Sequence, residues 1–344
     1  MEINGREVSD STSTNHAYKC HLDTLLGLSK DVKEEKLKHT MLYFDEQVGK
    51  AEANTIAGAG AYKEKQAAFT AKKGRYVRAP LYVDFFNCNR YFPPDCTVKL
   101  TFIRNSEAFC LIQAPANTKK YKLLVKDMFL IVKRIEANPQ KWSEHEQLYD
   151  KGMSAYLPIV HTTLTHKLIT KNTSTIVLDN VVLGEQVPFK IFMCLVEHDS
   201  FSGTLAKNPL VYKHHNLKEI EFHINGKSYP ATRYDFDWTK GNFLPGYFDL
   251  MKGIGAGSDN VSPNVTLDAF KDHAAIFCFD RSPDDCCGVH THLPLVGQVH
   301  AELTFSQELT TPISVIFYAF YQKLLKFSRE AKEFPPTVEF VHNI

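Results

Sequence analysis

The residues with the clearest potential for chemistry lie toward the C-terminal end of the chain, where cysteine and histidine side chains gather. The candidate metal ligands are Cys286, Cys287, His290, His292, His300 and Glu302. Zinc in proteins is bound mainly by cysteine sulfur and histidine nitrogen. The C-x2-C and H-x3-H spacings that make a zinc motif specific are not present in this segment. The pattern therefore favours a polar loop before a strand that starts near Gln298, and no metal ligand is assigned.

His290 and His292 are also similar to the H-x-H motif of cupins, which are metal enzymes built on a jelly roll. Cupins place a glutamate a few residues after this motif, whereas this chain has Val296 and Gly297 in that region. A cupin-like metal enzyme that uses His290, His292 and His300 is kept as a functional alternative.

Three further histidines could serve acid–base chemistry if one of them paired with a carboxylate. They are His198, His214 and His215. No serine lies in a G-x-S-x-G motif, so the histidines lack a recognisable nucleophile. Packing or capping is the favoured role, and no catalytic residue is assigned.

The glycines of the sequence Gly253-Ile-Gly255-Ala-Gly257 are similar to those of a phosphate-binding loop. A Rossmann fingerprint requires a preceding strand, a following helix and a later acidic residue within a βαβ unit. That architecture is not visible here. The segment is therefore predicted to be a flexible loop, and no cofactor-binding residue is assigned.

The elements that must position these residues are predicted to be mainly short strands. Helices are expected at residues 17–26, 31–39, 62–72 and 142–150, since these segments show helical spacing or helix-favouring residues. Strands are expected at 76–86, 98–104, 109–113, 121–135, 156–170, 175–183, 189–196, 217–224, 274–280, 298–305, 313–321 and 337–342, which are rich in β-branched and aromatic residues. Many short strands without a βαβ rhythm indicate an all-β sandwich or barrel with a few short helices.

The central segment 188–230 organises this pattern. Residues 189–196 (FKIFMCLV) form an apolar run, and residues 217–224 (LKEIEFHI) alternate apolar Ile220, Phe222 and Ile224 with polar side chains. Such alternation predicts a strand with one buried and one exposed face. Asn225-Gly226 then predicts a tight turn. We expect the connector between the two strands to join two barrels.

Composition excludes several classes of protein. The 40 basic and 39 acidic residues nearly cancel, so bulk charge predicts neither a nucleic-acid surface nor a membrane surface. No apolar run reaches the roughly 18–20 residues of a membrane span. The N-terminus has no apolar core that resembles a signal peptide, so the cysteines are expected to be reduced. The cysteines that we expect to pack in the core are Cys88, Cys96, Cys110, Cys194 and Cys278.

Four segments give the chain a resemblance to the double jelly-roll major capsid proteins of Polinton (Maverick) elements and adintoviruses. They are INGREVSDSTSTNHAYKCHLDTLLG, LYVDFFNCNRYF, VKLTFIRNSEAFCLI and LGEQVPFKIFMCLVEHDSFSGTLAKNPLVYKHHNLKEIEFHINGKSYP. The last is the most specific. The family has a similar order there: L-G before a proline, a strand ending in L-V, an A-F-N-G turn, N-P-F, H-x-N-L and an N-G or D-G turn. Ser200-Phe-Ser-Gly203 and Leu210 are mild departures from it.

The resemblance implies a double jelly roll with a first barrel over residues 1–204 and a second over residues 205–344. It implies a structural, non-enzymatic protein that forms homotrimeric, pseudo-hexameric capsomers of a viral-type icosahedral shell. Other capsid proteins, such as a penton or minor capsid protein, would be partners, without sequence-specific nucleic-acid binding. The expected location is the virion, with assembly in the host nucleus or cytoplasm. A host-retained relic that acts as a binding module is a further alternative.

One departure concerns the start of the chain. Family members usually carry opening strands before the I-N-G turn, whereas only Met1 and Glu2 precede Ile3 here. The first barrel is therefore expected to lack its opening strands. It should show an open sheet edge, which is an aggregation liability.

Overall fold

The structure is a computed structural model. It describes residues 1–9, 15–35, 37, 76–88, 90–92, 96–113, 118–133, 135–136, 138–184, 186–230, 233–256, 263, 265–282, 294–329 and 336–341. The candidate ligands Cys286, Cys287, His290 and His292 and the predicted helix 62–72 lie outside these residues. The described chain is mainly β, with antiparallel sheets and several helices. The many segments rich in β-branched and aromatic residues predict this mainly β character.

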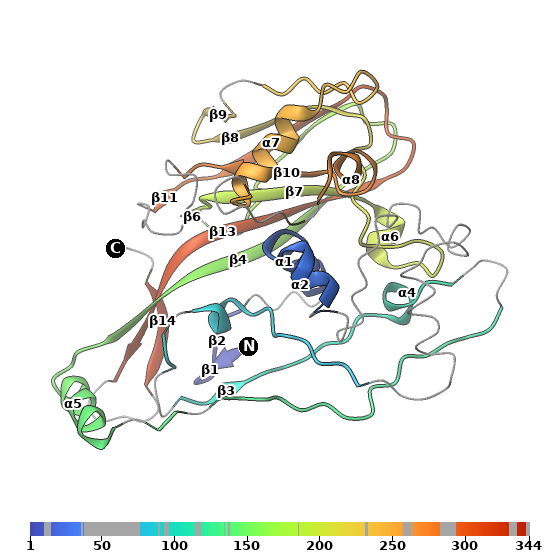
Figure 1. The fold of residues 1–344 in the computed structure, drawn as a ribbon. Coiled ribbons are helices and arrows are strands. Elements are labelled where there is room, and N and C mark those ends of the chain that lie inside the picture. Colours follow the sequence, from blue (N-terminus) through green and yellow to red (C-terminus); the bar gives the residue numbers. More distant parts are fainter. Residues whose placement is uncertain are drawn as a thin grey trace.

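Two long antiparallel strands form the axis of the molecule (Figure 1). β4 (Ala155–Ile169) pairs with β13 (Ile313–Ser328) along the whole length of β4. On its other side β13 pairs first with β7 (Lys190–Glu197) and then with β14 (Thr337–Val341). β10 (Ile276–Asp280) pairs with β7 and completes a five-stranded sheet.

A four-stranded sheet packs against the half of this sheet that is uppermost in Figure 1. Its strands lie in the order β5 (Thr175–Leu178), β12 (Val299–Phe305), β8 (Leu217–Ile224) and β9 (Lys227–Tyr229). Phe222 of β8 contacts Phe279 and Phe317 of the other sheet, with ring centroids 4.4 and 6.1 Å apart. Burying one such side chain contributes roughly 1.5–3 kcal/mol. The two sheets thus form a sandwich around one large core.

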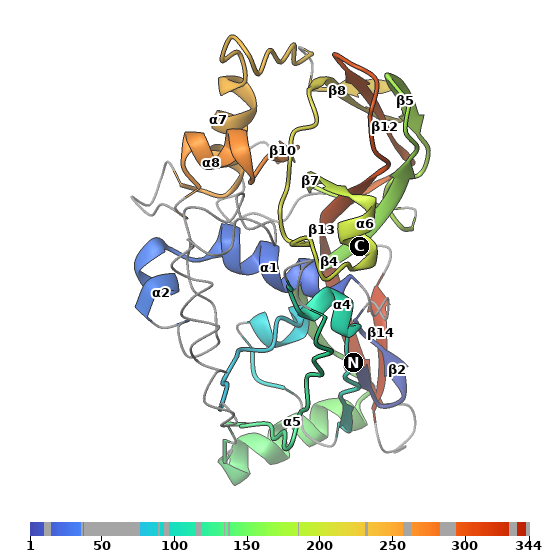
Figure 2. The same cartoon turned by 90° about the vertical axis from the view of Figure 1, so that its right-hand side faces the viewer.

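Helices cover the open face and the end of this sandwich (Figures 1 and 2). They are α1 (His16–Gly27), α2 (Lys30–Glu35), α6 (His198–Ser202), α7 (Leu244–Gly253) and α8 (Leu267–Asp272). α1 buries Tyr18, Leu22 and Leu26 in the large core, as their helical spacing predicts. Its predicted end at Gly27 is confirmed.

A second, smaller core lies below the sandwich. The hairpin of β1 (Glu2–Ile3) and β2 (Arg6–Glu7), together with β3 (Val98–Lys99), forms a short sheet there. The eight buried side chains of this core come from this region, from the 3-10 helix η4 (Asp84–Asn87), and from β4, β13 and β14. They are Ile3, Val8, Phe85, Leu157, Ile159, Leu325, Phe327 and Val338. β4 and β13 therefore contribute to both cores.

Four other elements complete the fold. α4 (Glu107–Cys110) and α5 (Pro139–Asp150) border the lower region, and β6 (Gln186–Val187) pairs with β11 (Leu295–Val296). Ser106 caps α4 by accepting a hydrogen bond from the Phe109 N–H, so the predicted strand 109–113 is wrong. α5 begins earlier than predicted because Asn138 caps it, with Pro139 at its first position.

Other strand predictions also differ from the structure. The predicted strand 175–183 ends at Leu178, and β13 continues past residue 321 to Ser328. Residues 76–83 are not in a strand and lead into η4, and only Val98–Lys99 of the predicted strand 98–104 forms one. Residues 121–133 contain no strand. A strand requires a partner, and sequence propensity alone does not supply one.

The sheets combine strands from both sides of residue 204. β7 lies between β10 and β13, and β5 pairs with β12. The division into residues 1–204 and 205–344 stays a prediction about domains and does not divide these sheets. Among the described residues β4 pairs with β13, and its other edge, the open edge, has no strand partner among them.

The described cysteines form no disulfides among themselves. Cys194 and Cys278 are buried in the large core as predicted. Cys88 and Cys96 are half-buried beside the smaller core. Core packing is the wrong prediction for Cys110, which is exposed at the end of α4.

Candidate functional site

Two of the predicted metal candidates lie on the outer face of the four-stranded sheet. His300 and Glu302 alternate with buried residues along β12, so both side chains point away from the core. His300 Nδ1 lies 2.9 Å from Asp179 Oδ1, and Glu302 Oε2 lies 3.3 Å from His223 Nε2. The other four candidates fall outside the described residues, so the cupin-like arrangement has no further support here.

The three candidate acid–base histidines lie in packing or capping positions. His198 Nδ1 is 3.0 Å from the hydroxyl of the buried Ser314. His214 stacks on Trp238 with ring centroids 4.0 Å apart, and its Nδ1 accepts a hydrogen bond from the Asn216 N–H. Burial, and then neighbouring His215, lowers the pKa of His214 to about 4. A neutral ring packed on tryptophan fits the predicted structural role.

The glycine-rich segment begins as the end of a helix. Gly253 is the last residue of α7, and its α-carbon packs directly on the side chain of Cys278 in β10. Gly255 follows with φ +74°, which ends the helix. No strand–loop–helix arrangement of a phosphate site surrounds these described glycines.

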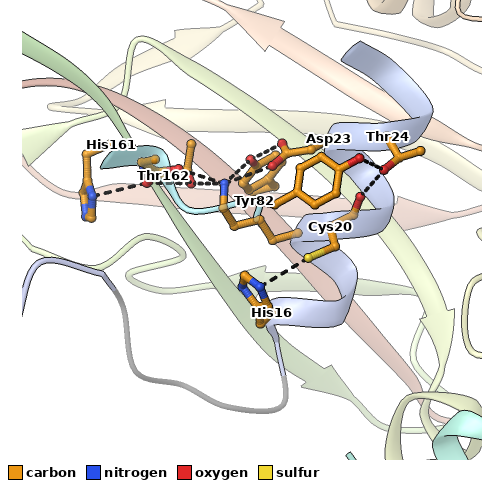
Figure 3. Close-up of polar contacts among 10 residues, drawn as sticks. His16, Cys20, Asp23, Thr24, Tyr82, His161 and Thr162 are labelled. Atoms are coloured by element: carbon orange, nitrogen blue, oxygen red, sulfur yellow. Dashed lines mark hydrogen bonds and ion pairs between the residues drawn. The ribbon is translucent and has the colours of Figure 1, made fainter. Parts of the chain in front are cut away.

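A buried polar network joins α1, η4, β4 and β13 (Figure 3). Its centre is Lys19, whose ammonium lies 3.0 Å from Asp23 and 2.8 Å from Asp84. The same ammonium donates to the hydroxyl groups of Thr162 at 2.8 Å and Tyr318 at 3.1 Å. Four elements that are distant in sequence therefore meet at one cation.

The two central groups of this network keep the same protonation state at physiological pH. Burial alone would lower the pKa of Lys19, but the carboxylates of Asp84 and Asp23 outweigh it and raise that pKa. Burial alone would raise the pKa of Asp84, but the neighbouring His161, whose Nδ1 lies 3.5 Å away, and Lys19 lower it to about 2. Lys19 is thus a cation and Asp84 an anion across the physiological range. The arrangement suits a structural joint better than acid–base catalysis.

The network also covers the open edge of β4. Asp84 Oδ2 accepts a hydrogen bond from the Thr162 N–H at 2.7 Å, and Asn15 Nδ2 donates to the Leu164 carbonyl at 3.0 Å. Thr162 and Leu164 are two residues apart, so their backbone groups point to the same side of the strand. Pro158 shares this side and has no N–H to expose. Side chains thus block part of an edge that could otherwise pair with another strand.

An exposed apolar segment lies in the lower part of the molecule. Residues 118–133 run along the side opposite α7 and α8 toward α5 (Figure 1). Eight large apolar side chains between residues 124 and 135 are more than half exposed, up to 69% at Leu124. They are Leu124, Val125, Met128, Phe129, Leu130, Ile131, Val132 and Ile135. An apolar surface of this kind commonly marks an interaction site.

Sequence reasoning does not find Lys19, Asp84 or Thr162. Their polar side chains lie in segments that read as a helix, a strand and another strand, and nothing in their spacing brings them together. The exposed segment is found by sequence as an apolar run, but its composition predicts a buried strand. A run of this length without a strand partner is visible only in the structure.

Comparisons with known proteins identify one similar curated protein. It is an uncharacterized protein of Caenorhabditis elegans, F54H12.2, which is 20% identical over 331 residues, covering 93% of this chain and 74% of the worm protein. No family model matches the chain. No helix in the described ranges is long and apolar enough to cross a bilayer.

Solved capsid structures show a distant likeness. The PBCV-1 virus capsid model has a TM-score of 0.34 and 8% identity, covering 54% of this chain and 52% of that chain. The mavirus major capsid protein has a TM-score of 0.26 and 9% identity, covering 54% and 41%. The Sputnik virophage structure has a TM-score of 0.29 and 10% identity, covering 55% and 39%. The matched part thus spans about half or less of these capsid proteins.

Proposed function

We propose that this chain is a structural protein that associates with copies of itself through the exposed apolar segment at residues 121–135. The observation that carries this proposal is the row of eight large apolar side chains that are more than half exposed. Fully burying one such side chain contributes roughly 1.5–3 kcal/mol. Several of them covered together would offset the entropy lost when chains associate.

A second copy of this chain is the proposed occupant of the segment. Residues 98–113, which include half-exposed Phe102 and Ile103, precede it and extend the apolar surface. Self-association of the kind found in closed homo-oligomers requires such a complementary surface and no catalytic group.

The finer form of the proposal follows the sequence resemblance to double jelly-roll major capsid proteins. The chain would form homotrimeric, pseudo-hexameric capsomers in the shell of a virion, with a penton or minor capsid protein as a further partner. Neither sequence-specific nucleic-acid binding nor an enzymatic step is part of this role.

The oligomeric state of the purified full-length chain tests the proposal. Size-exclusion chromatography with light scattering is expected to give about three times the mass of the single chain, 39.1 kDa. The triple variant L124S/F129S/I131S should shift this distribution toward the monomer. Loss of the exposed apolar surface, rather than loss of the core, would cause this shift.

A matched triple variant separates this surface from apolar surface in general. Val160, Leu168 and Val177 are also about half exposed, but they lie on β4 and β5 of the sandwich. V160S/L168S/V177S should leave the mass unchanged. A folded wild-type chain that is monomeric at all concentrations, or an equal shift in both triple variants, would contradict the proposal.

A further inference from the structure

The outer face of the four-stranded sheet carries a cluster of metal-binding side chains that the proposed assembly role does not use. Glu221 and His223 of β8 and Glu302 of β12 each present one possible ligand atom, and these atoms all lie within 4.8 Å of one another. The three side chains share the outer face because they alternate with the buried residues of the two strands. They are therefore held by a paired strand ladder rather than by a loop.

The strand register places two carboxylates against each other. Glu221 stands directly opposite Glu302, and His223 stands opposite His300. Two carboxylates in such a cross-strand pair repel each other and destabilise the sheet unless a cation lies near them. A cation near the two carboxylates would therefore reduce their repulsion and stabilise this part of the sheet.

The burial of Glu221 makes a nearby positive charge more important for its carboxylate. Its residue is 6% exposed, and its buried Oε2 makes no hydrogen bond of regular geometry. The guanidinium of Arg233 forms an ion pair with the same oxygen, but the Arg233 side chain is 58% exposed. A metal ion that displaced this exposed arginine would itself supply the positive charge that the buried carboxylate needs.

The surrounding groups orient the histidine as in known metal sites. Ser228 Oγ lies 3.3 Å from His223 Nδ1, while the opposite ring nitrogen, Nε2, faces Glu302 at 3.3 Å. A metal-bound histidine almost always has its second nitrogen held by such an outer partner. Asp179 holds the neighbouring His300 and leaves it outside the group of three.

From these contacts we infer that Glu221, His223 and Glu302 bind one divalent transition-metal ion, with zinc as the representative. Imidazole and carboxylate are both ligands of zinc. The ion would neutralise the opposed carboxylates and cross-link β8 to β12. This site is independent of the apolar segment, so its test does not depend on the oligomeric state.

Titration of the metal-free full-length chain with Zn²⁺ in a calorimeter tests this assignment. One ion per chain is expected; S228A should weaken the affinity by roughly 10–100-fold, and H223A and E302Q, which remove ligands, should weaken it more. Co²⁺ added to the wild-type chain should give visible absorption bands of a four-coordinate site, absent in H223A. Far-ultraviolet circular dichroism of the variants verifies that they are folded.

Two control variants locate the ion. His145 is exposed on α5, so H145A should bind Zn²⁺ like the wild type. The double variant H290A/H292A should also retain binding, because the proposed ligands lie elsewhere. Failure of the wild type to bind one ion, or loss of binding in H290A/H292A with full retention in H223A and E302Q, would overturn the assignment.

Discussion

At the scale of single residues, Lys19 is the group on which the joint between helices and strands depends. It is surrounded by Asp23, Asp84, Thr162 and Tyr318, and its side chain is largely buried. Removing one partner of a buried ion pair leaves the other charge uncompensated, which typically costs several kcal/mol. Lys19→Met is therefore expected to lower the free energy of unfolding by about 3 kcal/mol, measured by urea denaturation.

Lys30 provides the matched control for this substitution. It lies on α2, and its ion pair with Glu34 is 3.8 Å long and half exposed. Lys30→Met is expected to change the free energy of unfolding by less than about 0.5 kcal/mol. Equal effects at Lys19 and Lys30 would show that the buried network does not stabilise the fold.

A second residue-scale prediction concerns His215 and pH. Burial lowers the pKa of His215 to about 4; the nearby Glu197 opposes this, and Lys213 adds to it. The unfolded chain therefore binds more protons than the folded chain between pH 4 and 6.5. Stability that is fully present above pH 6.5 is lost as the pH falls toward 4, by roughly 2 kcal/mol after allowance for solvent screening.

Urea denaturation at pH 7.5, 5 and 4 measures this loss. His215 has φ +47°, so asparagine, which tolerates this conformation, is the suitable replacement. His215→Asn should lose less stability on acidification than the wild type does. The exposed His145→Asn should follow the wild-type curve, and identical pH dependence in all three chains would refute the prediction.

Residue roles could be predicted from sequence only where they are local. The packing role of His214 follows from the absence of a nucleophile, and the structure gives it Trp238 as a partner. Lys19 and Asp84 are 65 positions apart, and Lys19 and Thr162 are 143 positions apart. Glu221 and Glu302 likewise meet only through the register of β8 and β12. A local pattern in a single sequence cannot predict contacts between residues that are so far apart along the chain.

At the scale of elements, the docking of α7 onto β10 depends on Gly253. A β-carbon at this position would lie 2.1 Å from Cys278 Sγ and 3.2 Å from Cys278 Cβ. Gly253→Ala is expected to lower the free energy of unfolding by about 1–3 kcal/mol, because the buried cysteine must move. Thermal or urea denaturation measures the loss.

Two comparisons make this prediction specific. Gly27 ends α1 with no heavy atom within 4 Å of its added β-carbon, so Gly27→Ala should be neutral or slightly stabilising. Adding Cys278→Ala to Gly253→Ala should recover part of the loss, since the clashing sulfur is removed. A double variant whose losses simply add would argue against direct contact.

The open edge of β4 leads to a further element-scale prediction. Pro158 lacks an N–H on this edge, and proline at such positions discourages pairing with a foreign strand. Pro158→Val is expected to increase light scattering during incubation at elevated temperature, because it adds a donor and raises strand propensity. Thr163→Val, on the side of the strand that pairs with β13, should leave the scattering unchanged, and no difference between them would contradict the role of Pro158.

Elements were predictable where pattern and turn chemistry agree. Residues 217–224 form a strand with the predicted bounds, and Asn225 and Gly226 adopt the positive φ angles of the predicted turn. α1 likewise follows from its apolar spacing. Prediction failed at residues 109–113, where the cap at Ser106 outweighs strand propensity, and at 121–135, where no partner strand is described.

At the scale of the whole molecule, the two cores differ greatly in size. The upper core joins two sheets and several helices, whereas the lower one contains eight buried side chains. Local opening is easier where fewer apolar contacts must be broken. Backbone amides of β1, β2, β3 and β14 are therefore expected to exchange with deuterium faster than those of β7, β8 and β12.

Hydrogen exchange read by mass spectrometry on peptides measures this difference. β13 offers an internal comparison, because residues 313–320 pair with β7 and residues 324–328 pair with β14. The second part should exchange faster than the first. Uniform exchange along β13 would show that the two cores open together as one cooperative unit.

The continuous pairing of β4 with β13 also has a mechanical consequence. Fifteen residue pairs connect these strands, and the ladder runs past the junction between the two cores. A force that pulled the cores apart along the strands would be carried by the covalent backbones of both strands, because each strand belongs to both cores, while the ladder keeps the strands from sliding past each other. The two strands therefore act as a stiff beam, and a load applied at one end of the molecule reaches the other end with little extension.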